Sequence, residues 1–154
     1  MSEEVWGDVA GRLGTDEEGQ YHRLPIRVYF EDTDAGGVVY HASYVRFCER
    51  GRTDFLRLLG VEARQLISGE ASNEPAAFVV RRMTLDFKRP ARMDDLLVVE
   101  TRVKELGGAS VTLNQVVSRD GRAVFEADVV VVLISVAGKP LRLSDAIRVA
   151  FEGS

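Results

Sequence analysis

The sequence predicts an α+β domain in which an antiparallel sheet of about five strands wraps around one long central helix. One stretch has helical periodicity, and five segments have the alternation or β-branched composition of strands. Tight-turn sequences join most of the later strand segments to one another. The expected order is therefore strand, long helix, and then four strands, over 154 residues with no internal repeat.

The first expected strand runs from Leu24 to Glu31, where Ile26, Val28 and Phe30 alternate with polar neighbours. The next six residues read Asp-Thr-Asp-Ala-Gly-Gly. Asp side chains bond nearby backbone, and paired glycines permit positive φ. We therefore expect the strand to end before this turn.

The long helix is expected from about Ala42 to Leu59, about five turns, because apolar positions recur there every three or four residues. These positions are Tyr44, Cys48, Gly51, Phe55 and Leu59. Gly60 is the expected C-terminal cap. Ser43 is the expected N-cap, but no Glu or Gln follows three residues later, so the start could lie a residue or two earlier.

The four remaining strands are expected over residues 77–88, 96–106, 110–119 and 123–135. The pair Gly107-Gly108 predicts one hairpin turn, and Asp120-Gly121 predicts another of type I′. The last segment contains a β-branched run without alternation, which is typical of a strand inside a sheet with both faces buried.

Composition excludes several classes of protein. With 20 basic and 24 acidic residues the net charge is −4, so no overall positive field favours nucleic acid or anionic lipid. One cysteine, Cys48, excludes an internal disulfide, and one Cys with two His is too few for structural zinc. The longest apolar run, residues 129–134, is too short to span a membrane.

Hydrophobic residues make up 45% of the sequence, which predicts a single domain over residues 21–154. Residues 1–20 are rich in glycine and acids, so we expect a flexible leader, in which Trp6 alone could dock. The acidic start is unlike a signal peptide, which predicts a cytoplasmic protein.

The chemistry is expected between the first strand and the helix, where carboxylates and a histidine cluster. The sequence has no phosphate-binding glycine loop, Gly-x-Ser-x-Gly elbow or dinucleotide fingerprint. Helix N-terminal N–H groups can stabilise an oxyanion, and a carboxylate can act as base or nucleophile. These residues could equally have purely structural roles. Asp32 and Asp34 could accept hydrogen bonds from backbone N–H groups of a turn, and His41 could be a packing or capping residue. Cys48 lies on the apolar stripe of the helix, where a buried thiol would be inert.

Three runs resemble the 4-hydroxybenzoyl-CoA thioesterase family, most closely its Tol-Pal-associated, YbgC-type acyl-CoA thioesterase branch. They are RVYFEDTDAGGVVYHASYVRF from residue 27, FVVRRMTLDF from residue 78 and PARMDDL from residue 90. The resemblance covers about residues 24–150. It implies the hotdog fold, with the helix inside a curved sheet, and sites at the subunit interfaces of homodimers or homotetramers.

The resemblance implies that Asp34 is the catalytic carboxylate and that Asp32 is structural. It places a backbone oxyanion donor at or next to His41, whose side chain it makes a catalytic or orienting partner. The third hairpin, residues 107–110, departs from the aromatic-acyl branch, because it keeps only the serine and lacks basic residues for the phosphates of coenzyme A. The candidate substrate-binding residues are Tyr40, Arg81, Lys88, Arg89 and Ser110, with Arg82 and Arg92 as further basic candidates that could equally be solvated.

The expected function is hydrolysis of acyl-CoA to free acid and coenzyme A, in lipid metabolism. No metal or cofactor is expected, because coenzyme A is part of the substrate. The alternative is a module near the inner membrane that binds acyl carrier protein or acts as a scaffold, with little hydrolysis. A hotdog hydratase or dehydratase ranks last, because the sequence lacks the His and acid arrangement and the proline-glycine helix entry of the carrier-protein dehydratases.

Overall fold

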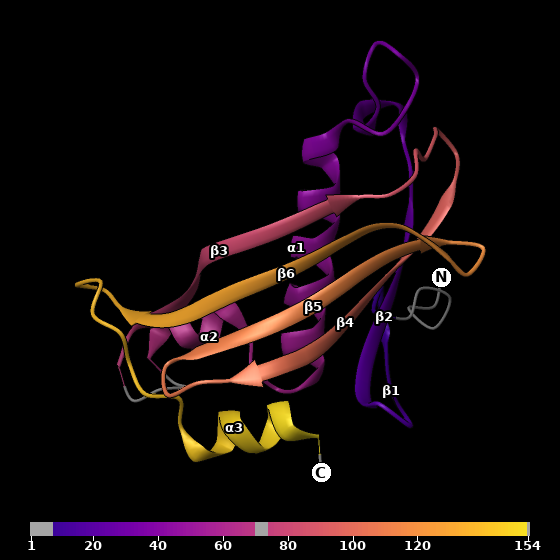
Figure 1. Cartoon of the computed structure of the whole chain (residues 1–154). Helices are drawn as coiled ribbons and strands as arrows, with labels where there is room; N and C mark the ends of the chain where they lie inside the picture. The colour runs from indigo at the N-terminus through magenta and orange to yellow at the C-terminus, as the bar shows by residue number, and fades with distance from the viewer. Residues whose placement is uncertain (1–7, 70–73, 154) are drawn as a thin grey trace, which may run out of the picture.

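The computed structural model describes residues 8–69 and 74–153, which form one antiparallel sheet with helices packed against it (Figure 1). In the described ranges the sheet has six strands in the order β1-β2-β4-β5-β6-β3. The strands are β1 (Arg12–Asp16), β2 (Gly19–Arg27), β3 (Ala76–Phe87), β4 (Leu96–Leu106), β5 (Ser110–Arg119) and β6 (Arg122–Ser135). The helices are α1 (His41–Leu58), α2 (Ala63–Ser68), α3 (Asp145–Glu152) and a short 3-10 helix, Phe30–Asp32. The predicted α+β architecture is confirmed, with one strand more than expected.

The sheet curves around α1, which crosses one of its faces obliquely (Figure 1). Three irregularities in strand pairing lie at residues 80–82, 103–105 and 117–118. Such bulges bend strands and increase their twist. They therefore help the sheet to wrap around the helix.

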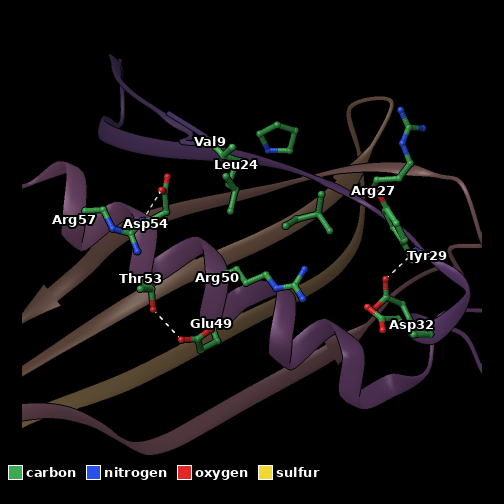
Figure 2. A pocket seen from close by; sticks show the side chains of 13 residues that line it. Val9, Leu24, Arg27, Tyr29, Asp32, Glu49, Arg50, Thr53, Asp54 and Arg57 are labelled. Atoms are coloured by element: carbon green, nitrogen blue, oxygen red, sulfur yellow. Dashed lines mark hydrogen bonds and ion pairs between the residues drawn. The ribbon is translucent and has the colours of Figure 1, made fainter. Parts of the chain in front are cut away.

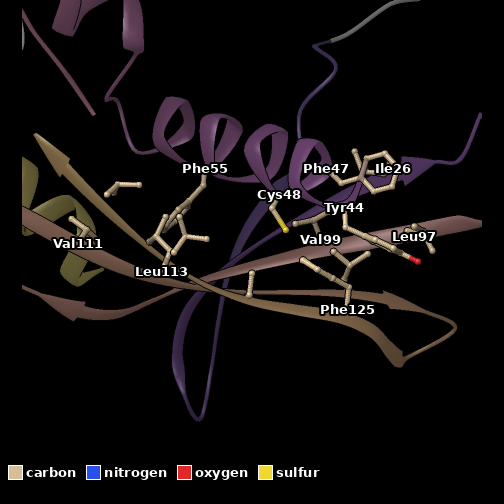
Figure 3. Close-up of a cluster of buried hydrophobic side chains, with 14 of the residues drawn as sticks. Ile26, Tyr44, Phe47, Cys48, Phe55, Leu97, Val99, Val111, Leu113 and Phe125 are labelled. Carbon is tan, nitrogen blue, oxygen red and sulfur yellow. The ribbon is translucent and has the colours of Figure 1, made fainter. Parts of the chain in front are cut away.

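The core lies between α1 and the concave face of the sheet (Figure 3). Phe47, Cys48 and Phe55 of α1 are fully buried there, against sheet residues such as Phe125. Gly51 also faces the sheet, and a Cβ at this position would lie 2.7 Å from Val99 Cγ1. A glycine inside a helix costs about 1 kcal/mol relative to alanine. Here it allows α1 to approach β4 closely.

The prediction of a flexible leader over residues 1–20 is wrong for residues 12–20, because this segment forms β1 and the turn into β2. Gly14 serves close packing instead of flexibility, since a Cβ at this position would collide with the Tyr21 ring. Gly19, at the turn, has a φ of +110°. Residues 1–7, including Trp6, lie outside the described residues.

The strand before the helix starts and ends earlier than predicted. β2 begins at Gly19 and stops at Arg27 instead of Glu31. Beyond it, the Val28 N–H donates to the Asp95 carbonyl at 2.9 Å, and the chain then turns into the 3-10 helix. The chain therefore leaves the sheet before it reaches the acidic turn.

The long helix has nearly the predicted extent, but its start differs. α1 begins at His41 with Tyr40 as N-cap, so Ser43 is not the cap and is instead buried in the first turn. Gly60 follows the helix with a φ of +87°, as expected of a helix-ending glycine. No helix in the described part of the chain is long and apolar enough to cross a membrane.

The last predicted strand, β6, lies inside the sheet between β5 and β3, as expected. Consecutive residues are buried at 124–125 and 131–133, while the rest of β6 alternates. Burial on both faces is thus limited to these two short stretches. The neighbouring strand β3 is one edge of the sheet, and most of its residues are exposed.

Candidate active site

Asp32 fixes the loop between β2 and the start of α1. Its buried carboxylate accepts hydrogen bonds from the Tyr29 N–H at 2.8 Å and from Arg46 Nη2 at 3.1 Å. Its carbonyl accepts the Tyr40 N–H at 2.9 Å and Ser43 Oγ at 3.0 Å. Both the carboxylate and the backbone carbonyl of Asp32 are therefore hydrogen-bonded to the helix start or to the preceding turn, which gives Asp32 a structural role.

Asp34 is exposed in the same loop, and one of its carboxylate oxygens is held by the turn. Oδ1 accepts the Gly36 N–H at 2.8 Å and the Val38 N–H at 3.4 Å. The Asp34 N–H donates to the Val38 carbonyl at 2.9 Å, and Gly37 adopts a φ of +83°. Oδ2 has no hydrogen-bond partner among the described residues. The turn thus fixes the carboxylate through one oxygen and leaves the other for solvent or a ligand.

His41 is the first residue of α1 and lies on the surface. Its ring centroid is 4.4 Å from that of Tyr40 and 6.4 Å from that of Phe87 on β3. Tyr40 provides no side-chain cap, and the Ser43 N–H donates to the Tyr40 carbonyl at 2.8 Å. The backbone N–H groups of His41 and Ala42 have no acceptor in the described ranges. They carry the partial positive charge of a helix N-terminus.

A small hairpin contains Asp34 and leads directly into α1. Thr33 pairs with Val39, and the Tyr40 N–H bonds to the Asp32 carbonyl, so Asp34 lies inside the hairpin and α1 starts directly after it. Of the two predicted catalytic residues, His41 therefore begins α1, and Asp34 lies in the turn that precedes it. The loop and the helix start contain an unbonded carboxylate oxygen and N–H groups without an acceptor among the described residues.

The candidate substrate-binding residues fall into two groups. Tyr40 lies beside His41, and Lys88 and Arg89 directly follow Phe87, at the same end of β3. Lys88 forms an ion pair with Glu126 at 3.4 Å, and Arg89 Nη1 donates to the Ala123 carbonyl. Arg81 and Arg82 are exposed in the middle of β3, at its bulge.

Ser110 is not brought to the candidate site within one chain. It pairs with Val132 of β6, whereas Phe87 pairs with Phe125, seven positions away along the same strand. At about 3.3 Å per residue, this separation is roughly 23 Å. Ser110 and the Phe87 end of β3 therefore lie well apart along β6.

Arg46 is a site residue that the sequence analysis missed. Its guanidinium bonds both to Asp32 and to Ser43 Oγ, the latter at 2.9 Å. The sequence could have indicated the contact with Ser43, because residues three apart on a helix lie on the same face. The contact to Asp32 joins the loop to the helix, which spacing alone does not reveal.

A groove of about 570 Å³ between β2 and α1 reaches the loop but does not include the candidate site (Figure 2). Asp32 and Tyr29 line one end, and Asp54 and Arg57, which form an ion pair at 3.1 Å, line the other. Neither Asp34 nor His41 lines this groove. In a single chain the candidate site is therefore an open surface beside the edge strand.

An antiparallel sheet curved around one long helix is the architecture of hotdog-fold proteins, and comparisons with known proteins agree. Residues 36–126 match the family model of the thioesterase superfamily. The acyl-CoA thioester hydrolase YbgC of Escherichia coli O6:H1 is 43% identical over 132 residues, 84% of this chain and 95% of its own. The chain belongs to the thioesterase superfamily and is a thioester hydrolase, as the resemblance implied.

Solved structures agree with the fold. A probable thioesterase from Bartonella henselae is 44% identical, with a TM-score of 0.78 over 80% of this chain and 99% of its own. A thioesterase from Thermus thermophilus, crystallised with coenzyme A and zinc, is 26% identical. Its TM-score is 0.70, over 84% of this chain and 90% of its own. The predicted hotdog fold is thus confirmed.

Proposed function

We propose that the protein hydrolyses acyl-CoA, with Asp34 as general base or nucleophile and the first-turn N–H groups of α1 as the oxyanion site. The observation that carries this proposal is a carboxylate with one unbonded oxygen in the hairpin that leads directly into a helix N-terminus without a side-chain cap. The curated name of the Escherichia coli relative, an acyl-CoA thioester hydrolase, supports the substrate class.

In the proposed reaction the thioester carbonyl oxygen lies against the N–H groups of His41 and Ala42. Attack on the carbonyl carbon moves negative charge onto that oxygen, which the helix N-terminus stabilises. Asp34 Oδ2 either takes a proton from the attacking water or attacks the carbonyl carbon directly. In both routes the tetrahedral intermediate collapses, the C–S bond breaks, and coenzyme A leaves as a thiolate that takes up a proton. After direct attack the collapse leaves a mixed anhydride, which water then cleaves to the free acid and the Asp34 carboxylate. No cofactor takes part, because coenzyme A belongs to the substrate.

The nucleotide end of the substrate is proposed to lie along the basic end of β3. Lys88 and Arg89 follow the strand end that contacts His41, so they are the nearest candidates for phosphate contacts. The coenzyme A complex of the Thermus thermophilus neighbour supports coenzyme A as the carrier. We further propose that the activity belongs to cytoplasmic lipid metabolism.

The proposed site is completed by a second copy of the chain. β3 is 12 residues long and forms an edge of the sheet, with Val79, Val80 and Leu85 exposed. Long apolar edges favour pairing with another chain. Antiparallel pairing of two β3 strands about Arg81 and Arg82 would place residue 87 of one copy opposite residue 76 of the other. The candidate site would then lie at a dimer interface, and two dimers would form the proposed tetramer.

The test is the variant Asp34→Asn. Asn keeps the oxygen that accepts the Gly36 and Val38 N–H groups, so we expect the fold and melting temperature to change little. It cannot act as base or nucleophile, so kcat for acyl-CoA hydrolysis should fall by at least roughly 10².

The matched control is Asp145→Asn, an exposed acid at the start of α3, which should retain wild-type kcat. Retention of more than about a tenth of wild-type kcat by Asp34→Asn would overturn the assignment. The alternative is a module near the inner membrane that binds acyl carrier protein or acts as a scaffold, with little hydrolysis. It requires that any residual hydrolysis be independent of Asp34. Hydrolysis assays on acyl-CoA thioesters of different chain lengths, and on thioesters of acyl carrier protein, would define the substrate.

The two roles of Asp34 can be separated by single-turnover hydrolysis in ¹⁸O-water. Direct attack followed by water addition at the enzyme carbonyl leaves ¹⁸O in the Asp34 side chain, which mass spectrometry detects. General-base catalysis, like water addition at the substrate carbonyl of the anhydride, leaves the side chain unlabelled and places the label in the released acid, so ¹⁸O in Asp34 is the result that identifies direct attack.

A further inference from the structure

The loop that joins β3 to β4 holds the hairpin that contains Asp34. The Val39 N–H donates to the Ala91 carbonyl at 2.8 Å, and Val38 forms an antiparallel bridge with Arg92. On its other side Val38 accepts the Asp34 N–H at its carbonyl and donates to Asp34 Oδ1. The second strand of the hairpin therefore lies between the Asp34 turn and this loop. The position of the Asp34 carboxylate thus depends on where the loop is fixed.

Asp95 fixes the loop to the sheet. Its Oδ2 accepts the Arg92 N–H and Arg119 Nη1, each at 2.8 Å. Its N–H donates to the Arg92 carbonyl at 3.1 Å, and its carbonyl accepts the Val28 N–H at 2.9 Å. Arg119 is the last residue of β5, which lies inside the sheet between β4 and β6. A single carboxylate oxygen therefore joins the loop to an inner strand.

The charge of Asp95 strengthens this junction. Desolvation alone would raise the pKa of the Asp95 carboxyl, but hydrogen bonds from the Arg92 N–H and from Arg119 outweigh it and hold this pKa below its ordinary value of 3.8. Asp95 is therefore ionised at neutral pH, and its hydrogen bonds are charge-assisted. Both side chains of the ion pair are partly exposed, so its contribution to stability should be small. Its larger effect should be on the geometry of the loop.

We propose that Asp95 is a positioning residue for Asp34. It acts through the β3–β4 loop and the second strand of the hairpin, and the inference rests on the proposed catalytic role of Asp34. A shift of the loop would move the Asp34 carboxylate relative to the helix start, and a displacement of about 1 Å can cost on the order of 10² in rate. Lys88 and Arg89, the proposed phosphate contacts, are held separately by β6. Substrate binding should therefore change less than turnover.

The test is steady-state kinetics of Asp95→Asn on one acyl-CoA. Asn keeps an oxygen that can accept the Arg92 N–H, but it lacks the charge that holds Arg119. We expect kcat to fall at least about fivefold, with KM within about twofold of wild type. Values of kcat within about twofold of wild type would overturn the proposal.

The ion pair is tested from its other side with Arg119. Arg119→Met should lower kcat as Asp95→Asn does, and Arg119→Lys should retain most of the wild-type kcat, because the ammonium group can still pair with Asp95. The double variant Asp95→Asn/Arg119→Met should lose no more than either single variant, since both remove the same contact. Fully additive losses would overturn the proposal.

The matched control is Asp128→Asn, which breaks another partly exposed ion pair between strands. Asp128 of β6 pairs with Lys104 of β4 at 2.6 Å and also accepts Asn114 Nδ2. Asp128→Asn should lower the melting temperature about as much as Asp95→Asn and keep the wild-type kcat. An equal loss of kcat in both variants would mean that Asp95 acts only through general stability, which would contradict positioning.

Amide hydrogen exchange measured by NMR reports the hairpin without reference to catalysis. In Asp95→Asn the Val39 N–H should exchange at least about threefold faster than in wild type, because the loop that accepts its hydrogen bond is less fixed. The Gly107 N–H, bonded to the Ser110 carbonyl in another hairpin, should be unchanged. Unchanged exchange at Val39 would overturn the proposal.

Asp34→Asn separates this inference from the proposed function. If Asp34→Asn keeps the wild-type kcat, the proposed function fails, and the positioning role fails with it. If Asp34→Asn loses activity while Asp95→Asn does not, only the positioning role fails.

Discussion

Asp32 and Asp34 are two residues apart and differ in what their oxygens bind. Both carboxylate oxygens of Asp32 are engaged, one by the Tyr29 N–H and the other by Arg46. In Asp34 one oxygen accepts the Gly36 and Val38 N–H groups of the β-turn, and the other has no hydrogen-bond partner among the described residues. A buried carboxylate with all its hydrogen bonds made stabilises a loop, whereas an exposed one with a free oxygen can react. The geometry therefore supports the assignment of catalysis to Asp34.

At the same scale, His41→Ala should lower kcat less than Asp34→Asn does. The proposed oxyanion contact comes from the backbone N–H of residue 41, which remains when the side chain is shortened. Steady-state kinetics of the two variants on one acyl-CoA would measure the difference. Equal losses would mean that the imidazole takes a direct chemical part.

Cys48 should be unreactive in the folded protein. It is fully buried on α1, and burial raises the pKa of its thiol to about 12. The thiolate fraction at pH 8 is then about 10³ lower than that of an ordinary cysteine, and access is blocked as well. Iodoacetamide at pH 8 should therefore modify Cys48 only after denaturation in urea. Equal rates in native and unfolded protein would contradict this expectation.

Among the elements, the β1–β2 hairpin shows how a glycine-rich segment becomes ordered. Arg102 of β4 donates to Asp16 at the end of β1, with Nη1 to Oδ1 at 2.9 Å. The Arg102 guanidinium also lies 5.3 Å from the ring centroid of Tyr21 on β2. Such contacts across strands hold β1 in the sheet although its local sequence favours a turn or coil.

The Asp16 contact predicts a pH-dependent stability. The hydrogen bond from Arg102 holds the pKa of the Asp16 carboxyl below its ordinary value of 3.8. Because the folded pKa is the lower one, the stabilisation is present above pH 3.8 and is lost as the pH falls through the folded value. Asp16→Asn should thus melt at a lower temperature than wild type at pH 7, and the difference should shrink toward about pH 2.5. A difference that is the same at both pH values would rule out this linkage.

At the scale of the whole molecule, the unpaired edge of β3 predicts self-association. Light scattering at micromolar concentration should give at least about 34 kDa, twice the chain mass of 17.0 kDa. Leu85→Lys places a charge on the exposed edge strand and should shift the protein toward the monomer. Val149→Lys on the exposed face of α3 is the control and should leave the mass unchanged. A wild-type mass near 17 kDa would refute the dimer.

Local patterns determined the extent of several elements, because they depend on neighbouring residues alone. Helical periodicity and Gly60 predicted α1 to within one residue at each end. The glycine-containing turns delimited β4, β5 and β6 correctly. The run around Asp34 placed the candidate site at the helix start and indicated the family that the comparisons confirmed.

Tertiary structure alone decided the features that join distant segments. β1 is a strand because residues from β2 and β4 pack and bond to it, and no local pattern encodes those partners. The placement of β3 beside β6 at the sheet edge, and of Ser110 far from Asp34, follows from strand pairing over long sequence separations. Periodicity and turn chemistry are local, whereas desolvation and charge pairing depend on which residues the complete fold brings into contact.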